Sequence, residues 1–348
     1  MLLPVEPPDW MADTRALGAA LRAGTYRPRA VAQAIGIIAW NGKQMDGRWW
    51  ERANCAEGVL GDQVELLLRG GAISSERARA ALPEAAWSAR LLDETPEGVT
   101  LDGTIVPLEF DLVWTDTPTR AFTGNDGLFL PDSTTLAVRR CLPCEPVARH
   151  LDLGSGGGGV AARAARSALE TIALDINPRA GLGCHRTAAL SGLPNIRPYT
   201  GAGAEACTLG TFDRVSFVLP LLVPWSGLAA APVHTVAEDR NLLREVLELL
   251  PTLLAPGGLA VLYTQAWAGD RFPGGGVRDT LAAAFGSRPW RGAYWWDYEG
   301  PSPVGPLRAG ILAVRADRTR GYVEAPLDAV DVGVDDWWPG LARLLGEG

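Results

Sequence analysis

The sequence predicts an α/β fold of Rossmann-like type: a mostly parallel, seven-stranded sheet with an antiparallel last strand, covered by helices. From residue 146 onward, short apolar runs alternate with amphipathic stretches of helical spacing. That alternation indicates a parallel sheet with helices on both faces. The first apolar run passes directly into the glycine-rich loop DLGSGGGG (152–159), which leads into a helical stretch. A glycine loop between a strand and a helix is typical of sheets that bind nucleotides.

Each expected element has a local reason. Strands are expected at the short apolar runs 147–153, 171–176, 195–200, 212–220 and 258–265, and near 292–298 and 308–315. Helices are expected over 161–168, 178–190, 236–254 and 278–285. Pro178 suits the first turn of a helix, and leucines line one side of 236–254 before Pro256 ends it. The segment EGPSPVGP between the last two strands is too short for a helix, so these strands should pair antiparallel.

The first hundred or so residues differ from the rest. Helical patterns at 13–22, 57–68 and 75–82 precede an alternating stretch, 98–114, with Asp102-Gly103 at its expected turn. Helices followed by a small hairpin predict a winged-helix-like α+β module over residues 1–118, with a lid, substrate-binding or dimerisation role. The α/β domain is expected over 119–318. Residues 319–348 form a C-terminal tail, in which Trp337 and Trp338 are candidates to dock the tail onto the domain.

Composition excludes several classes of protein. The net charge of −8 and the pI of about 5.1 disfavour non-specific nucleic-acid binding, which needs surplus Lys and Arg. No apolar run reaches the length of a membrane span, and no secretory signal is seen at the N-terminus. The five cysteines form no disulfide framework, and the CxxC pair Cys141 and Cys144 lacks further metal ligands. We expect a cytoplasmic monomer or homodimer without a metal.

The glycine loop is the candidate binding site. Glycines allow a tight turn and a close approach of a ligand to the main chain, and the following helix offers unpaired N–H groups. Gly154, Gly156 and Gly159 also satisfy the dinucleotide pattern G-x-G-x-x-G. Asp175, at the end of the next strand, stands where a carboxylate accepts hydrogen bonds from ribose hydroxyls. These residues predict a ligand that contains adenosine, without deciding which.

Three features favour a sulfonium nucleoside over a dinucleotide. Asp152 precedes the first glycine, where it would attract the ammonium group of a methionine moiety and repel a pyrophosphate. The turn LLAPGG (253–258) and the late antiparallel pair are the other two. The segments HLDLGSGGGG, ALDIN, FDRVSFVLP and LLAPGG together resemble the successive motifs of the class I S-adenosylmethionine (SAM)-dependent methyltransferases, over about residues 120–316.

The resemblance implies SAM as cofactor. The cofactor-binding residues that it implies are Asp132, Asp152, Gly154, Ser155, Gly156, Gly158, Asp175, Ile176, Ala202 and Val218. The layout is most similar to the release-factor glutamine and ribosomal-RNA guanine N-methyltransferases. By that similarity, Asp132 would open a helix that closes over the cofactor; the alternative is an ordinary capped helix.

The chain departs from that family at two places. The family's Asn-Pro-Pro-aromatic motif, whose asparagine accepts a hydrogen bond from the target nitrogen, is replaced by Val218-Leu219-Pro220-Leu221. The acid expected after the third strand is replaced by Ala202, and Glu205 compensates only if the register shifts. SAM binding should survive both losses. Glutamine and guanine as acceptors are disfavoured.

Methyl transfer depends mainly on positioning, and a base is needed only if the acceptor must lose a proton. His234 is the candidate base and Asp239 the alternative, although both also suit an ordinary helix start. Trp225 and Trp267 are candidates to wall an acceptor pocket. The sequence favours methyl transfer to an O or N atom of a small-molecule acceptor. Open alternatives are an N-methyltransferase acting on protein or RNA, a SAM enzyme with another reaction, and a catalytically silent scaffold.

Overall fold

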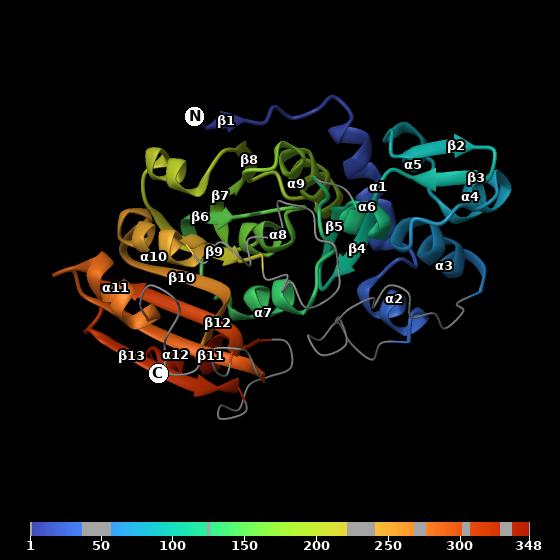
Figure 1. Cartoon of the computed structure of the whole chain (residues 1–348). Coiled ribbons are helices and arrows are strands. Elements are labelled where there is room, and N and C mark those ends of the chain that lie inside the picture. The colour runs from blue at the N-terminus through green and yellow to red at the C-terminus, as the bar shows by residue number, and fades with distance from the viewer. Residues whose placement is uncertain are drawn as a thin grey trace.

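The chain is built on one nine-stranded sheet with helices on both faces (Figure 1). The computed structural model describes residues 2–36, 57–123, 126–220, 241–267, 276–300, 307–327 and 336–347. The strand order is β1-β8-β7-β6-β9-β10-β12-β11-β13. Their bounds are β1 Leu3–Pro4, β6 Val147–Leu153, β7 Ala168–Asp175, β8 Ile196–Thr200, β9 Phe212–Val218, β10 Leu254–Trp267, β11 Trp290–Gly300, β12 Leu307–Ala316 and β13 Gly321–Pro326.

The predicted sheet is confirmed at its centre and extended at both edges. Strands β6 to β10 run parallel, and β12 lies antiparallel between β10 and β11, as expected for the late pair. The expectation of seven strands is wrong. The two-residue strand β1 pairs antiparallel with β8, and β13 pairs parallel with β11. The predicted C-terminal tail therefore contributes a strand to the sheet.

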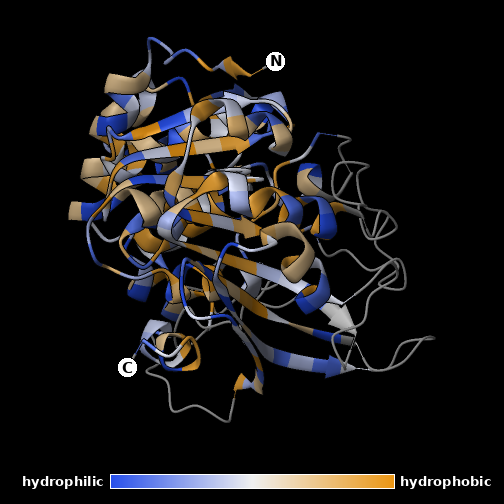
Figure 2. Cartoon of the chain, turned by 90° about the vertical axis from the view of Figure 1, so that its left-hand side faces the viewer, coloured by the Kyte–Doolittle hydropathy of each residue, from blue (hydrophilic) through white to orange (hydrophobic). Residues whose placement is uncertain are grey.

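Helices divide between the two faces of the sheet. Helices α7 (Ser133–Cys141), α8 (Gly159–Ala165), α9 (Pro178–Ser191) and α12 (Trp338–Leu344) pack on one face. Helices α10 (Asn241–Leu253) and α11 (Val277–Phe285) pack on the other. In Figure 2 the hydrophobic colour runs along strands in the middle of the molecule, with mixed colours on the helices around them. Residues on β6 alternate accordingly: Leu151 and Leu153 point to the α10 face.

The N-terminal part holds several short helices and two small hairpins. Its helices are α1 Met11–Ala23, α2 Pro28–Ala34, α3 Gly58–Gln63 with a π-helical turn at Val64–Leu68, α4 Ser75–Ala81, α5 Ala85–Ser88 and α6 Pro118–Thr123. Its hairpins pair β2 (Leu92–Thr95) with β3 (Gly98–Leu101), and β4 (Thr104–Leu108) with β5 (Asp111–Thr115).

The predicted single hairpin over 98–114 is wrong. Asp102-Gly103 links the two hairpins, and the tight turn instead lies at Glu109-Phe110, where Glu109 has a φ of 51°. Gly103, at a φ of 110°, allows the chain to leave one hairpin for the next without a side chain, whose Cβ would lie 2.5 Å from the Thr115 carbonyl oxygen. The alternation predicted the strands, but it did not show that each of β3 and β4 pairs with the neighbour on its other side.

The N-terminal part and the α/β part share one hydrophobic core. Helix α1 crosses α9 so closely that a Cβ at Gly18 would lie 2.1 Å from the Leu190 carbonyl oxygen. Ala180 and Leu190 of α9 belong to the same buried cluster as Leu17 and Trp114 of the N-terminal part.

The last helix also packs on the sheet. The rings of Trp337 and Trp295 meet edge to face with centroids 6.0 Å apart, which matches the expected docking role of the tail. Within the described ranges, no helix has the length and apolar character needed to cross a membrane.

Candidate nucleoside-binding site

The glycine loop turns sharply at the carboxyl end of β6. Gly154, Gly156 and Gly158 have φ values of 58°, 49° and 84°, in the left-handed region that favours glycine. A Cβ at Gly157 would lie 2.3 Å from the carbonyl oxygen of Trp114, so this side of the loop is packed against β5. A Cβ at Gly156 would meet no atom within 4 Å. The loop therefore presents its main chain to open space at Gly156.

Asp175 lies beside that open position at the end of β7. Its Oδ2 accepts a hydrogen bond from the Gly156 amide at 2.8 Å, and its Oδ1 accepts one from the Asn177 amide, also at 2.8 Å. Burial raises the pKa of the Asp175 carboxyl, while these two amides favour its ionised form. Each carboxylate oxygen has a second lone pair that can accept a ribose hydroxyl. Ile176, next in sequence, is 68% exposed and offers an apolar surface at the same edge.

The turn after β8 follows the strand next to β7, at the same carboxyl-terminal edge of the sheet as Asp175. Ala202 is exposed there, and a Cβ at Gly203 would meet no atom within 4 Å. Glu205 folds back onto its own turn, where its Oε2 accepts a hydrogen bond from the Ala202 amide at 2.9 Å. Its carboxylate therefore caps the 3₁₀ helix Gly203–Leu209. Its predicted role as a substitute for the missing acid stays a prediction.

Asp152 is more deeply buried than its sequence position indicated. It is 2% exposed, and its Oδ1 accepts a hydrogen bond from the hydroxyl of Ser216 on β9 at 2.6 Å. The Ser216 oxygen lies 2.8 Å from Nε2 of His150, which is also buried. Asp152 Oδ2 is enclosed and has no side-chain donor among the described residues, and the backbone amide of Ala161 on α8 also favours the ionised carboxylate. Sequence reasoning missed Ser216 and His150, although both fall on the same face of neighbouring strands by simple alternation.

Helix α7 begins next to the loop. Asp132 caps it: Oδ1 accepts hydrogen bonds from the Thr134 amide at 2.9 Å and the Thr135 amide at 3.2 Å. The Thr135 methyl lies 3.2 Å from where a Cβ of Gly159 would be, so the start of α7 faces the start of α8. The structure thus shows the ordinary capped helix, and closure of α7 over a cofactor stays a prediction. Val218 is the last residue of β9.

The side chains of the remaining predicted site residues lie outside the described part of the structure. Trp225, His234 and Asp239 lie outside the described residues. Trp267 ends β10, and only its main chain, paired with Leu307, is described. The acceptor pocket and the base therefore stay predictions.

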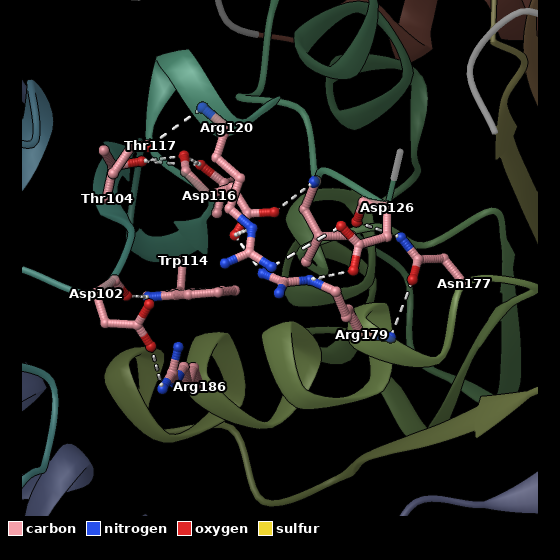
Figure 3. A network of polar contacts seen from close by, with 12 residues as sticks. Asp102, Thr104, Trp114, Asp116, Thr117, Arg120, Asp126, Asn177, Arg179 and Arg186 are labelled. Atoms are coloured by element: carbon pink, nitrogen blue, oxygen red, sulfur yellow. Dashed lines mark hydrogen bonds and ion pairs between the residues drawn. The ribbon is translucent and has the colours of Figure 1, made fainter. Parts of the chain in front are cut away.

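A network of ion pairs and hydrogen bonds connects the N-terminal part to the residues that follow Asp175 (Figure 3). Asp116, just after β5, is 1% exposed and forms ion pairs with Arg179 and Arg120, and its Oδ2 accepts a hydrogen bond from the Leu128 amide at 2.8 Å. The Asn177 side chain donates to the Asp126 carbonyl at 2.9 Å. Asn177 is also the residue whose amide holds Asp175, so this network fixes the chain directly after the candidate ribose acid. Sequence reasoning missed it.

The chain has low similarity to solved protein structures, in both sequence and fold. No protein-family model and no curated protein matches the chain. The Trm5b structure from Pyrococcus abyssi is similar at 15% identity and a TM-score of 0.44, over 65% of this chain and 62% of that one. The M. jannaschii tRNA m1G37 methyltransferase has 15% identity and a TM-score of 0.40, over 63% and 58%.

A third similar structure is described as a precorrin 8W decarboxylase from Methanobacterium thermoautotrophicum. It has 17% identity and a TM-score of 0.35, over 57% of this chain and 97% of that one. The chain spans less than two thirds of the length of Trm5b and of the M. jannaschii tRNA m1G37 methyltransferase. At such identities and TM-scores, these likenesses assign neither substrate nor reaction to this chain.

Proposed function

We propose that the chain is a SAM-dependent methyltransferase that transfers a methyl group to an O or N atom of a small-molecule acceptor. One observation carries the proposal: the main chain at Gly156 is open and its amide is held by Asp175, in a loop that begins at a second, buried carboxylate, Asp152. The site stands at the carboxyl ends of parallel strands, where open α/β sheets bind ligands. The antiparallel β12 between β10 and β11 supports the same class.

The charges of this site fit SAM better than a dinucleotide. A pyrophosphate along the loop would lie near the buried Asp152, whose negative charge would disfavour it, whereas Asp175 suits the ribose of either ligand. The methionine moiety of SAM carries an ammonium, and Asp152 is a buried carboxyl group with no ion pair to an arginine among the described residues. Burying an ionised carboxylate without a counter-charge costs free energy, and a cationic ligand group would supply that charge.

The residues of the chain would act mainly by positioning. Asp175 would hold the ribose hydroxyls, Ile176 would contact the adenine, and the Gly156 main chain would pass close to the nucleoside. SAM, when bound, supplies a methyl carbon already activated by its sulfonium. Any proton lost by the acceptor would need a base, for which His234 and Asp239 remain the candidates.

The acidic net charge and the replaced Asn-Pro-Pro motif support a small-molecule acceptor. Transfer to a nitrogen of a protein or RNA is the second candidate. The N-terminal part favours it, because β5 packs directly against the glycine loop and could bring a large acceptor to the site. Association with RNA that weakens steeply as salt rises would support this candidate.

Asp175→Ala tests the site. We expect the variant to bind S-adenosylhomocysteine (SAH) about 1–3 kcal/mol more weakly than the wild type, because the ribose hydroxyls lose their acceptor. Titration calorimetry measures this difference. Asp279→Ala, an exposed acid in the first turn of α11, is the matched control and should bind SAH as the wild type does. Unchanged affinity in Asp175→Ala, or binding of NAD in place of SAH, would contradict the assignment.

A further inference from the structure

Asn177 makes three hydrogen bonds directly after the strand that ends at Asp175. Its backbone amide donates to Asp175 Oδ1 at 2.8 Å, and its own Oδ1 accepts from the Arg179 amide at 3.0 Å. Its Nδ2 donates to the Asp126 carbonyl oxygen at 2.9 Å. The residue is buried. The first bond orients the carboxylate, the second begins α9, and the third joins this turn to the segment that follows α6.

Asp116 of the N-terminal part fixes that segment. Its Oδ2 accepts a hydrogen bond from the Leu128 amide at 2.8 Å, and both residues are buried. A Cβ at Gly127 would lie 2.7 Å from a backbone carbonyl oxygen of α6, so the segment also packs closely on that helix. The Asp126 carbonyl that accepts from Asn177 is only two residues from the Leu128 amide. Asp116 therefore determines where this acceptor lies.

The same carboxylate also reaches the other side of Asn177. Arg179 forms an ion pair with Asp116 Oδ1, and the backbone amide of Arg179 is the donor to Asn177 Oδ1 (Figure 3). Arg120 lies 3.6 Å from the same carboxylate oxygen, so the buried Asp116 faces two guanidinium groups. Two routes therefore lead from Asp116 to Asn177, one through the main chain of 126–128 and one through Arg179.

We infer that Asp116 and Asn177 are positioning residues for the cofactor, which make its affinity depend on contacts of the N-terminal part. Both act through Asp175. With the two routes intact, the Asn177 amide stays 2.8 Å from Asp175 Oδ1, and the carboxylate keeps the orientation in which its remaining lone pairs meet the ribose hydroxyls. The inference rests on the proposed function, in which Asp175 holds the ribose. It gives the N-terminal part a role in cofactor binding.

Asn177→Ser separates the two tasks of the Asn177 side chain. Serine caps a helix about as well as asparagine does, so it can still accept from the Arg179 amide. Its shorter side chain has no amide group to donate to the Asp126 carbonyl. We expect a folded protein that binds SAH about 3- to 30-fold more weakly than the wild type, as for residues that modulate a site without touching its ligand. Titration calorimetry measures the affinity, and circular dichroism checks the fold.

Asp116→Asn removes the charge that holds Arg179, and it should weaken SAH binding to a similar degree. Asp102→Asn is the matched control. It breaks another ion pair between the N-terminal part and α9, at 3.0 Å to Arg186, but Asp102 lies outside both routes to Asn177. This control should bind SAH as the wild type does. A loss in Asp102→Asn as large as in Asp116→Asn would overturn the inference.

A double-mutant cycle distinguishes positioning of Asp175 from a general loosening of the structure. If the network acts through Asp175, Asn177→Ser should weaken SAH binding in the wild-type background and leave it unchanged in the Asp175→Ala background. Equal losses in the two backgrounds would show that Asn177 acts on SAH binding by another route, and the inference would be wrong.

The outcomes separate this inference from the proposed function. If the wild type binds no SAH, the proposed function is wrong, and the positioning role falls with it. If the wild type binds SAH and Asp175→Ala binds it more weakly, whereas folded Asn177→Ser binds it as the wild type does, only the positioning role is wrong.

Discussion

Replacing Arg139 with methionine is expected to lower the free energy of unfolding by about 3–5 kcal/mol, because the buried Asp111 loses one of its two arginine partners and Glu109 loses its partner. Arg139 is fully buried in α7. Its guanidinium donates to Asp111 at 2.9 Å and to Glu109 at 2.7 Å, and it also bonds the Gly159 carbonyl oxygen. Asp111 would keep Arg166, which bonds its other oxygen at 2.6 Å, and the nearby charge of Arg22.

Urea unfolding followed by circular dichroism measures this loss. Arg244→Met is the matched control, because Arg244 forms an exposed ion pair with Glu248 on α10 and such pairs contribute about 0.3–0.5 kcal/mol. A loss in Arg139→Met no larger than in the control would show that the buried network does not hold α7 to the β4–β5 hairpin.

Gly18→Ala is expected to destabilise the protein by about 1–3 kcal/mol or more, because the added methyl group overpacks the crossing of α1 and α9. The new Cβ would lie 2.1 Å from the Leu190 carbonyl oxygen and 2.6 Å from the Leu190 Cα. These are backbone atoms, so one helix must move away from the other. The same substitution on an isolated helix would be stabilising.

Gly203→Ala is the control for this substitution. A Cβ there meets no atom within 4 Å, and its φ lies outside the left-handed region. It should leave the urea midpoint unchanged or raise it slightly, since alanine restricts the unfolded chain. If Gly18→Ala is as stable as this control, the close approach of α1 to α9 is not a constraint on the fold.

Local pattern predicted the central elements of the fold well. Strand β6 runs over 147–153 as expected, and the antiparallel pairing of β11 with β12 followed from the short connection between them. Strand β1 escaped prediction because two residues, Leu3–Pro4, carry no periodicity. The hairpin pairing of β3 was wrong because alternation identifies strands but says nothing of which neighbour a strand chooses.

The residues of the candidate site likewise fall into those that the sequence predicts and those that it does not. The loop 152–159 and Asp175 could be predicted as site candidates from the sequence, because their spacing along the chain carries the signal. Ser216 and His150 were missed because their contact joins two strands 66 residues apart. Asp152 lies at the start of the loop, but its burial and its lack of a cationic partner depend on groups from β9, α8 and α9, which its place in the sequence does not show.

The two edge strands of the sheet bear on which fragments of this protein would keep the sheet edges paired. β1 covers the outer edge of β8, and β13 covers the outer edge of β11. A fragment trimmed to residues 119–318 would lose both, and two rows of backbone amides and carbonyls would become unpaired. Bare edges of this kind recruit strands from other molecules. We therefore expect a fragment of residues 119–318 to associate or aggregate more readily than the whole chain, because β1 and β13 would no longer cover the two sheet edges.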